Sequence, residues 1–258
     1  MSQKVPIHIT ELDSMKKYPN KLYYKGNLTL LKRPKVSIVG SRKALTYTKD
    51  MTYKIAKALS SRGVCIVSGA AMGVDTIAHA GAKVNNTIAV VANGLDIRYP
   101  KVNEKLIEDI ETNGLVLSQF ENGFQATHWS FVVRNELVVA LGDILIVTQA
   151  DIDSGTMRSV EYAIEMQKPI WVLPHRNGDS DGTNMLLQKG LAKAIYEIDE
   201  FANIFGKESN DDIPKDEFYY FIQTSPTLDD AILKFGDRVY EAELEGVVAI
   251  QNGIVTFV

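Results

Sequence analysis

Two kinds of segment alternate along the chain between residues 36 and 173. Short runs rich in valine, isoleucine and leucine occupy residues 36–39, 64–67, 88–91, 115–118, 144–147 and 170–173. Between them lie segments with apolar residues at helical spacing, the clearest at residues 104–111, 131–141 and 156–166. Strands and helices in alternation predict parallel pairing with right-handed crossovers, and strands apolar on both faces predict helices on both sides of the sheet. We predict an α/β fold: an extended Rossmann-like, doubly wound, mostly parallel sheet over residues 30–206, preceded by an N-terminal extension of residues 1–29.

The segment after the first strand is expected to be a helix that ends at Gly63. Its predicted buried stripe consists of Tyr47, Met51, Ile55, Ala58 and Leu59. A further helix is expected to start near Asp75.

A second, smaller module is predicted at the carboxyl end. Residues 207–214 are polar, acidic and end in proline, as linkers do. Helix-like segments follow at residues 216–223, 227–235 and 237–245, and two short strands at residues 247–251 and 254–258. Asn252-Gly253 between the strands is a strong hairpin signal. Three small helices and a hairpin predict a winged-helix module over residues 215–258.

Composition places the chain among globular proteins. It has 258 residues, of which 45% are hydrophobic and 23% charged, so it can bury a core and is not a disordered chain. No apolar run approaches the ~20 residues that span a bilayer, and the first residues lack the apolar core of a signal peptide. The single cysteine, Cys65, excludes an intrachain disulfide, and its place in a strand predicts core packing. We expect a cytoplasmic protein without membrane contact.

Charge is distributed unevenly. The net charge is −4, yet residues 1–50 carry +8 and residues 197–258 carry −10. A basic amino-terminal part favours a polyanion or phosphate ligand near the first motifs, and an acidic tail repels one. Two solvated faces of opposite sign explain the same distribution, so charge alone leaves both interpretations open.

Small and polar residues follow three of the predicted strands. These clusters are Gly40-Ser41-Arg42, Ser68-Gly69-Ala70-Ala71-Met72-Gly73 and Asp153-Ser154-Gly155-Thr156. In open parallel sheets, ligands bind beyond the carboxyl ends of the strands, where helix amino termini present free N–H groups. Each cluster by itself also fits a tight turn with a helix cap. Three clusters on one edge of one sheet favour a rim that contacts several phosphates of a strand.

Known catalytic and nucleotide-binding motifs are missing from the sequence. It contains no Gly-x-Gly-x-x-Gly after the first strand, no P-loop and no Gly-x-Ser-x-Gly. The histidines, His8, His79, His128 and His175, lack the spacing of metal ligands. We therefore expect no cofactor and no metal, and no set of residues resembles an assembled acid/base pair.

Phe131 and Arg134 are the most informative pair outside these clusters. They lie one helical turn apart, so a ring and a guanidinium could hold one nucleotide, by base stacking and by a phosphate contact. The alternative is that Phe131 belongs to the core and that Arg134 pairs with a neighbouring carboxylate.

Ordered motifs over most of the chain resemble the DprA/Smf family, the DNA-processing protein A of natural transformation. The resemblance runs from Tyr18 to Val258 and rests on residues 22–27, 36–42, 68–75, 78–79, 93–100, 103, 134–135, 154–156 and 182–184. Residues 243–247 are similar to the winged helix (DML1-like) that ends many members.

The resemblance implies a protein of competence and homologous recombination that binds single-stranded DNA without cutting it. It also implies protection of incoming DNA, loading of the RecA recombinase and a homodimer. The residues to which it assigns DNA contacts, with their neighbours, are Gly40, Ser41, Arg42, Lys43, Ser68, Gly69, Phe131, Arg134, Asn135, Ser154, Gly155 and Thr156.

The chain departs from the family pattern at two places near this set. Relatives often carry a basic residue near Thr127-His128-Trp129, and usually arginine or lysine where this chain has Glu136. The carboxyl-terminal module also departs from the charge of a DNA-binding domain, because residues 215–258 carry −5. Acidic residues in the segment 237–245 would face phosphates with the wrong sign, so we interpret the module as a protein-contact module.

Two rival functions share part of this pattern. A nucleoside-monophosphate phosphoribohydrolase of the LOG family also has a helical arginine and a Gly-Thr turn, resembled here by Arg134 and Gly155-Thr156. Its catalytic glutamate has no match directly after Thr156, since the first acid is Glu161. A protein adaptor that acts through the acidic module, without DNA binding, is the third possibility.

Overall fold

A computed structural model describes residues 2–207, 216–244 and 247–257 of the chain. Two compact units make up the chain, residues 1–208 and residues 209–258. Within the described residues, no helix is long and apolar enough to cross a membrane. The predicted linker, residues 207–214, lies outside the described residues except for Lys207.

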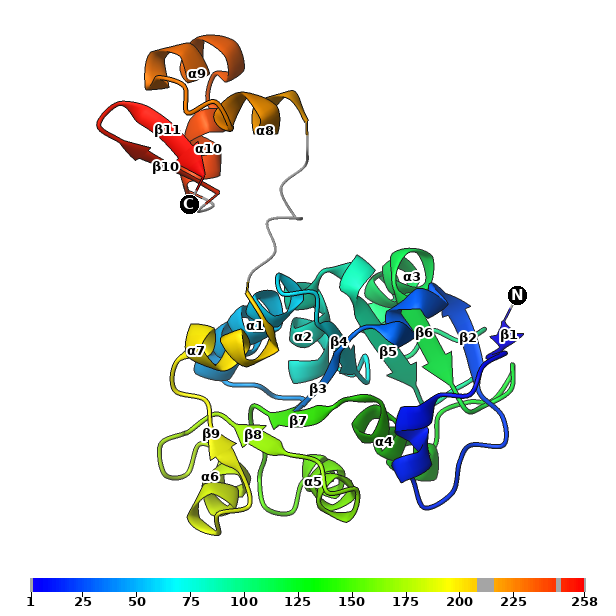
Figure 1. The fold of residues 1–258 in the computed structure, drawn as a ribbon. Coiled ribbons are helices and arrows are strands. Elements are labelled where there is room, and N and C mark those ends of the chain that lie inside the picture. The colour runs from blue at the N-terminus through cyan, green and yellow to red at the C-terminus, as the bar shows by residue number, and fades with distance from the viewer. Residues whose placement is uncertain (1, 208–215, 245–246, 258) are drawn as a thin grey trace. The chain divides into compact units, whose positions relative to one another are not determined.

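The first unit contains a nine-stranded sheet in the order β1-β2-β6-β5-β4-β3-β7-β8-β9 (Figure 1). Its strands are β1 Gln3–Lys4, β2 Tyr23–Gly26, β3 Lys35–Val39, β4 Cys65–Ser68, β5 Thr87–Val91, β6 Leu115–Ser118, β7 Ile144–Val147, β8 Ile170–Val172 and β9 Lys193–Ala194. Neighbours from β6 to β9 are parallel, whereas β2 pairs antiparallel with β6 and β1 with β2. The chain moves outward from β3 through β4, β5 and β6 and then returns to β7 on the other side of β3. The prediction of a doubly wound, mostly parallel sheet is confirmed.

The first 29 residues contribute to this sheet rather than preceding it. Tyr23 lies opposite Ser118, and Gly26 opposite Leu115, in the antiparallel pair of β2 and β6. The sheet therefore begins before residue 30, where the sequence pattern placed its start. The pattern missed these strands because β2, at the antiparallel edge, is only partly buried and does not present a continuous apolar run.

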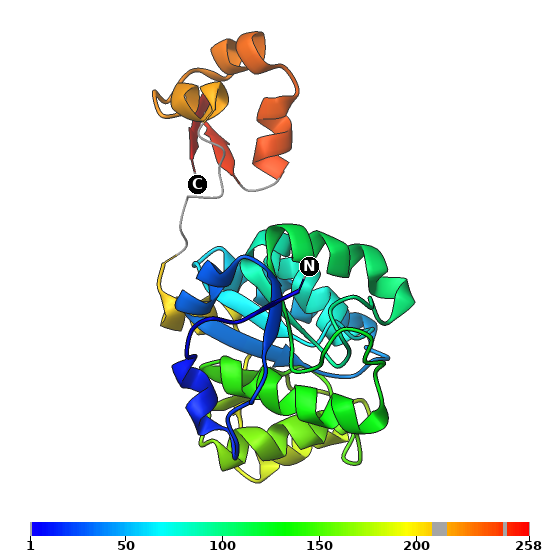
Figure 2. The ribbon, with the colours of Figure 1, turned by 90° about the vertical axis from the view of Figure 1, so that its right-hand side faces the viewer.

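Helices cover both faces of the sheet (Figures 1 and 2). On one face lie α1 Thr46–Ser60, α2 Val74–Ala82, α3 Glu104–Asn113 and α7 Ile198–Ala202. On the other lie α4 His128–Leu141, α5 Gly155–Glu165 and α6 Asp181–Gln188. Strand residues alternate between these layers, since Val36 and Ile38 face α1 while Val39 faces α4.

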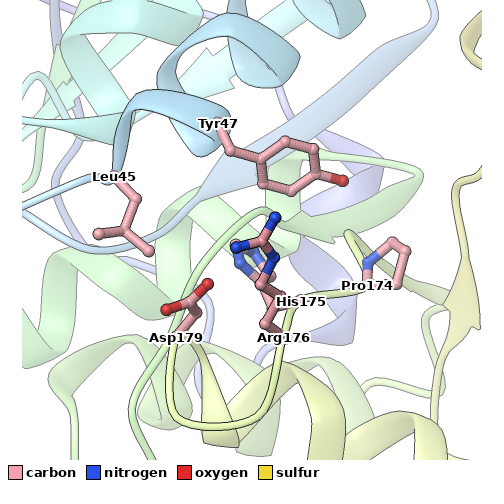
Figure 3. Close-up of a pocket in the computed structure, with 6 residues that line it drawn as sticks. All are labelled: Leu45, Tyr47, Pro174, His175, Arg176 and Asp179. Carbon is pink, nitrogen blue, oxygen red and sulfur yellow. The ribbon is translucent and has the colours of Figure 1, made fainter.

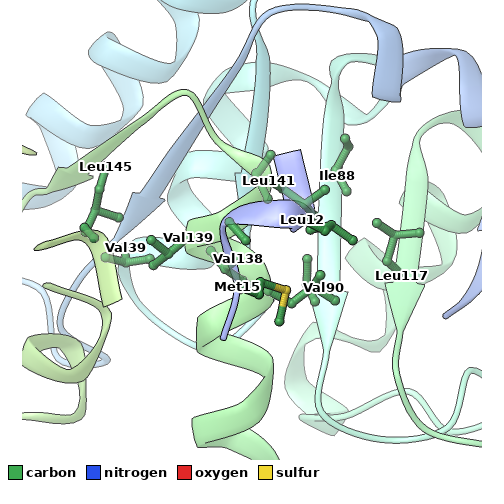
Figure 4. Packing of buried hydrophobic residues seen from close by; sticks show 14 of the residues in the cluster. Leu12, Met15, Val39, Ile88, Val90, Leu117, Val138, Val139, Leu141 and Leu145 are labelled. Carbon is green, nitrogen blue, oxygen red and sulfur yellow. The ribbon is translucent and has the colours of Figure 1, made fainter. Parts of the chain in front are cut away.

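The amino-terminal segment also covers one end of the α4 layer. Its short 3₁₀ helix η1, Thr10–Ser14, packs against α4, and Figure 4 shows Leu12 and Met15 among the buried side chains of α4 and the strands. Lys35 in β3 is only 2% exposed and forms a 2.5 Å ion pair with Glu11 of η1. Burial opposes ionisation of Glu11, but hydrogen bonding and attraction from Lys35 lower its pKa overall. The pair fixes η1 to the sheet.

The buried face of α1 differs from the predicted stripe. Ile55 and Leu59 are buried as expected, but Tyr47 is 44% exposed. The core face instead contains Thr48, Thr52, Ile55, Ala56 and Leu59. In the first two turns threonines are buried in place of the larger apolar residues beside them, so a prediction from hydrophobicity alone was one residue off there. Gly63, at φ +78°, follows the helix as expected.

The second unit has three helices and a hairpin in the predicted order: α8 Glu217–Ile222, α9 Leu228–Phe235, α10 Arg238–Leu244, β10 Val248–Gln251 and β11 Ile254–Phe257. Asn252 and Gly253 both have positive φ, as a two-residue hairpin turn requires. A core that includes Phe218, Ile222 and Val239 holds these elements together. The assignment to the winged-helix class stays a prediction, and Glu245 lies outside the described residues.

Candidate nucleic-acid interface

A pocket lies at the carboxyl ends of β3, β4 and β5. It is lined by Arg42, Gly69, Ala71, Met72, Ala92, Asn93, Tyr99, Pro100, Phe131 and Arg134. The loops after these strands supply most of the lining, and α4 supplies Phe131 and Arg134. The position beside β3, from which the chain winds in both directions, is where open parallel α/β sheets bind ligands. We call this site the Phe131 pocket.

The loop after β3 is held by the neighbouring β7 loop. Ser41 N donates to the carbonyl oxygen of Gln149 at 2.9 Å, and the Gln149 side chain accepts from Leu45 N and from the Thr48 hydroxyl, both at 2.9 Å. A Cβ on Gly40 would approach Val74 Cγ2 to 2.6 Å, so this position needs glycine. These contacts fix the backbone and leave the side chain of Arg42 exposed at the pocket.

The turn after β4 approaches the loop after β3 closely. Gly73 has φ +79°, and a Cβ there would lie 2.4 Å from the Ser41 carbonyl oxygen. Ala70 also adopts a positive φ of 56°, and its carbonyl oxygen accepts from Asn103 Nδ2 at 2.9 Å. The second Gly-rich cluster thus brings two strand ends together, which its glycines permit.

Phe131 lies in the first turn of α4, half-buried, with polar groups and rings around it. Thr127 and Ser130 form a reciprocal capping box that fixes the start of the helix. The guanidinium carbon of Arg42 is 5.2 Å from the centre of the Phe131 ring, and the Tyr99 ring centre is 6.1 Å away. One ring therefore adjoins an exposed cation and an exposed second aromatic side chain.

Arg134 lies beneath this surface and is only 5% exposed. Its guanidinium carbon is 5.8 Å from the Phe131 ring centre, its Nη1 is 3.7 Å from Asp75 Oδ2, and Nη1 donates to the Val90 carbonyl oxygen at 3.3 Å. Burial raises the pKa of Asp75 against the attraction of Arg134, and burial lowers the pKa of Arg134. Arg134 thus pairs with a carboxylate, that of Asp75, as the alternative interpretation expected. Its guanidinium also packs against the Phe131 ring from the buried side.

Gly69 makes room for this arginine. A Cβ at Gly69 would lie 1.2 Å from Arg134 Nη1 and 2.7 Å from Asp75 Oδ2. Any other residue would displace the ion pair and with it the support of Phe131.

His79 extends the buried polar cluster. Thr87 Oγ1 donates to the Ile66 carbonyl oxygen at 2.8 Å, so the 2.6 Å contact with His79 Nδ1 requires a proton on Nδ1. Nε2 is buried without a partner among the described residues. Burial, followed by repulsion from Arg134, lowers the pKa of His79 to about 3. The histidine is therefore neutral at physiological pH.

The predicted site residues fall into three groups. Arg42, Gly69, Phe131 and Arg134 line one pocket. Ser68 is fully buried, and its hydroxyl donates to the Ile38 carbonyl oxygen at 2.7 Å, which corrects the predicted DNA contact of its side chain: this hydroxyl holds two strands together. The residues that lie outside the lining are Gly40, Ser41, Lys43, Asn135, Ser154, Gly155 and Thr156.

Two of the residues outside the lining, Ser41 and Ser154, have local structural roles. Ser41 Oγ accepts from Lys43 N at 3.1 Å, which closes the loop and leaves the Lys43 side chain exposed. Ser154 precedes α5 and donates to the Asp151 carbonyl oxygen at 2.7 Å rather than capping the helix. Cys65 is fully buried, and burial raises its pKa to about 12, so the predicted core role is confirmed.

Sequence reasoning did not select Tyr99 and Met72 as site residues, although Met72 lies in the second small-residue cluster. Both are exposed, at 49% and 47%. Large apolar side chains exposed beside a glycine-rich strand end were the available signal, and Tyr99 also lies in a segment that carried the family resemblance.

The fold and this pocket define a class: a Rossmann-like protein with a pocket at the switch point of its sheet, the position at which open α/β sheets bind ligands. A sequence profile described as "DNA recombination-mediator protein A" matches residues 3–206. The chain therefore belongs to that family, the DprA/Smf proteins.

Relatives and solved structures agree with this family. The chain is 40% identical over 176 residues to the DNA processing protein DprA of Streptococcus pneumoniae, covering 67% of this chain and 62% of that protein. It is 37% identical to Protein Smf of Synechocystis, covering 61% of this chain and 41% of that protein. The chain thus spans less than two thirds of the length of these relatives.

The structural comparison covers more of the chain. A structure of DNA processing protein A from Helicobacter pylori, described by its single-stranded DNA binding mode, superposes with a TM-score of 0.77 at 43% identity. It covers 79% of this chain and 94% of the other. DprA from S. pneumoniae gives a TM-score of 0.73 at 34% identity, covering 81% of this chain and 75% of that one.

Proposed function

We propose that this protein binds single-stranded DNA at the Phe131 pocket, without chemistry on the strand. The observation that carries the proposal is the half-buried Phe131 ring beside the exposed Arg42 guanidinium, 5.2 Å from its centre. A base stacked on the ring would place its phosphate near Arg42 and Lys43. The single-stranded DNA binding that names the H. pylori structure supports the same ligand.

Single strands fit this arrangement better than duplex. Stacking on Phe131 requires an unpaired base that can leave its own stack, and a flexible backbone can follow the loops after β3, β4 and β5. These contacts are made to the faces of the bases and to phosphates, which all nucleotides share, so we expect little base preference.

The finer role that we propose is that of the family: protection of incoming DNA and loading of RecA during transformation and recombination, as a homodimer. In this role we propose that the acidic carboxyl-terminal unit contacts proteins rather than DNA. Its α10 exposes Glu241 and Glu243, which would repel phosphates. Cytoplasmic location follows from the same proposal.

A phosphoribohydrolase is less well supported than a binding protein. The first acid after the Gly155-Thr156 turn, Glu161, pairs with Arg158 within α5. Neither residue lines the Phe131 pocket. Incubation with AMP should release no free base.

The test is a titration of the full chain with single-stranded DNA, blunt duplex of equal length and a mononucleotide, each at two salt concentrations. We expect the single strand to bind most tightly. Arg42→Ala should weaken all sequences alike, and Arg42→Lys should recover only part, because a point charge replaces a bidentate fork. Equal or tighter binding of the duplex, or an Arg42→Ala variant with unchanged affinity, would contradict the proposal.

A further inference from the structure

A second pocket opens on the other side of the loop that carries Arg42. It has a volume of about 480 Å³ and is lined by Leu45, Tyr47, Pro174, His175, Arg176 and Asp179 (Figure 3). Leu45 and Tyr47 come from the loop after β3 and the first turn of α1, and the other four come from the segment after β8. This volume is within the range of small-molecule sites.

One wall of this pocket is a fixed aromatic pair. Tyr47 is 44% exposed and packs edge to face on His175, with ring centres 5.3 Å apart at 87°. His175 cannot turn away, because its Nε2 contacts the Thr148 carbonyl oxygen at 2.7 Å and its backbone N donates to Asn184 Oδ1 at 3.2 Å. The Tyr47 ring thus packs against a hydrogen-bonded histidine while much of its own surface stays open.

The segment after β8 also brings charge to this pocket. Figure 3 shows Arg176 and Asp179 extending from one turn into the space beside Tyr47. Both are exposed, and within the described residues neither forms an ion pair with another side chain. A free guanidinium suits a phosphate, whereas a carboxylate repels phosphate and accepts hydrogen bonds from base N–H groups.

The two pockets share the loop after β3. Arg42 lines the Phe131 pocket and Leu45 lines the second one. Three residues span at most about 11 Å, so the pockets lie within reach of one short strand. The exposed Lys43 lies between them on the same loop.

We propose that the second pocket is a further nucleotide subsite for the same single strand. A base stacks on Tyr47 with its N–H groups toward Asp179, and the adjoining phosphate contacts Arg176. The strand then runs from Phe131 across Lys43 to Tyr47. This inference rests on the proposed binding of single-stranded DNA. It adds the path that the strand follows along the edge of the sheet.

The experiment measures affinity against oligonucleotide length by fluorescence anisotropy, for the full chain and its variants. Tyr47→Ala should leave the affinity for the shortest bound oligonucleotides unchanged and weaken the binding of longer ones about 5- to 150-fold, the effect of losing one stacked base. Tyr47→Phe keeps the ring and should restore the longer strands. Tyr53→Ala is the matched control, because Tyr53 is 46% exposed on the same helix outside the pocket.

Arg176→Ala provides a second measurement. It should reduce the salt dependence of binding by about one counterion for long oligonucleotides only. The subsite is wrong if Tyr47→Ala behaves like Tyr53→Ala, or if it weakens short and long strands equally. If Phe131→Ala and Arg42→Ala also leave every length unchanged, the proposed function itself fails. If Phe131→Ala and Arg42→Ala weaken DNA binding and Tyr47→Ala does not, only the subsite is contradicted.

Discussion

Both units of this protein place cations on phenylalanine rings, but they do so in opposite settings. In the second unit Arg238 lies 4.5 Å from the Phe218 ring centre and Lys234 lies 4.7 Å from that of Phe221. Each of these cations also has an acidic partner: Arg238 pairs with Asp216 at 2.6 Å and Lys234 with Glu217 at 3.0 Å. In the first unit Arg42 lies 5.2 Å from Phe131 and forms no ion pair within the described residues.

The burial of the rings separates the two units only in part, because Phe221 is half-buried, as Phe131 is. Phe218 is 2% exposed and belongs to the core of its unit, whereas Phe131 is half-buried at the mouth of a pocket. A cation on a ring is therefore no evidence of a binding site by itself. A cation without an acidic partner, next to a ring that lines a pocket, distinguishes a surface suited to phosphates from a packed module.

The largest expected effect is the loss of Phe218. Phe218→Ala should destabilise the second unit by about 3–5 kcal/mol, because it removes a fully buried ring. Hydrogen exchange of α8, α9 and α10 in the full chain should accelerate. DNA affinity and the unfolding transition of the first unit, followed by Trp129 and Trp171, should stay unchanged. A loss of DNA affinity would remove the contrast between the two units.

Phe131→Ala should show the reverse pattern. Single-strand affinity should fall by about 1–3 kcal/mol, while the melting temperature changes little, because the ring is half-buried at the surface. Titration and thermal unfolding on the same variant separate the two effects. A large loss of stability with normal affinity per folded molecule would place Phe131 in the core instead.

Acid should destabilise the first unit before the second. The pKa of His79 falls from 6.5 to about 3 on folding, so the folded state excludes a proton that the unfolded chain accepts. Stability is present in full above pH 6.5 and is lost as the pH falls toward 3, by about 2 kcal/mol at pH 5. His79→Asn keeps a donor to Thr87 and should reduce this dependence in a tryptophan-monitored denaturant titration. If the pH dependence of stability is the same in this variant, His79 is not its source.

The second unit should respond only at lower pH. Hydrogen bonding to Arg238 lowers the pKa of Asp216 below its usual 3.8, so this contribution is present above pH 3.8 and is lost below it. Hydrogen exchange of α8 at pH 5 should therefore match that at pH 7 after correction for the intrinsic rate. If α8 already exchanges faster at pH 5, the two units do not differ in their response to acid.

The smallest effect compares the two arginines. Arg42→Ala should lower the salt dependence of single-strand binding by about one unit, as expected for one lost phosphate contact. Arg238→Ala should leave that dependence unchanged, because its charge is already paired within the second unit. Equal slopes for the two variants would mean that Arg42 does not contact phosphate.

Local patterns predicted much of the fold. The strands from β3 to β8 and the helices α1 to α5 lie within a few residues of their predicted positions, because a buried strand and an amphipathic helix have distinct periods. Gly63 and Asn252-Gly253 were recognisable as turns from their identity alone. By contrast, five elements have short or mixed patterns and were missed: β1, β2, α6, β9 and α7.

The candidate site was predictable only in part, for a physical reason. Arg42, Gly69 and Phe131 come from motifs whose residue types suit phosphates and bases, so the sequence by itself determined which strand ends could bind. Whether a side chain serves the ligand or the sheet depends on neighbours far away in the chain. Only the tertiary structure buried Ser68 against Ile38, placed Asp75 under Arg134 and left Tyr47 open, since burial and pairing arise where separate segments meet.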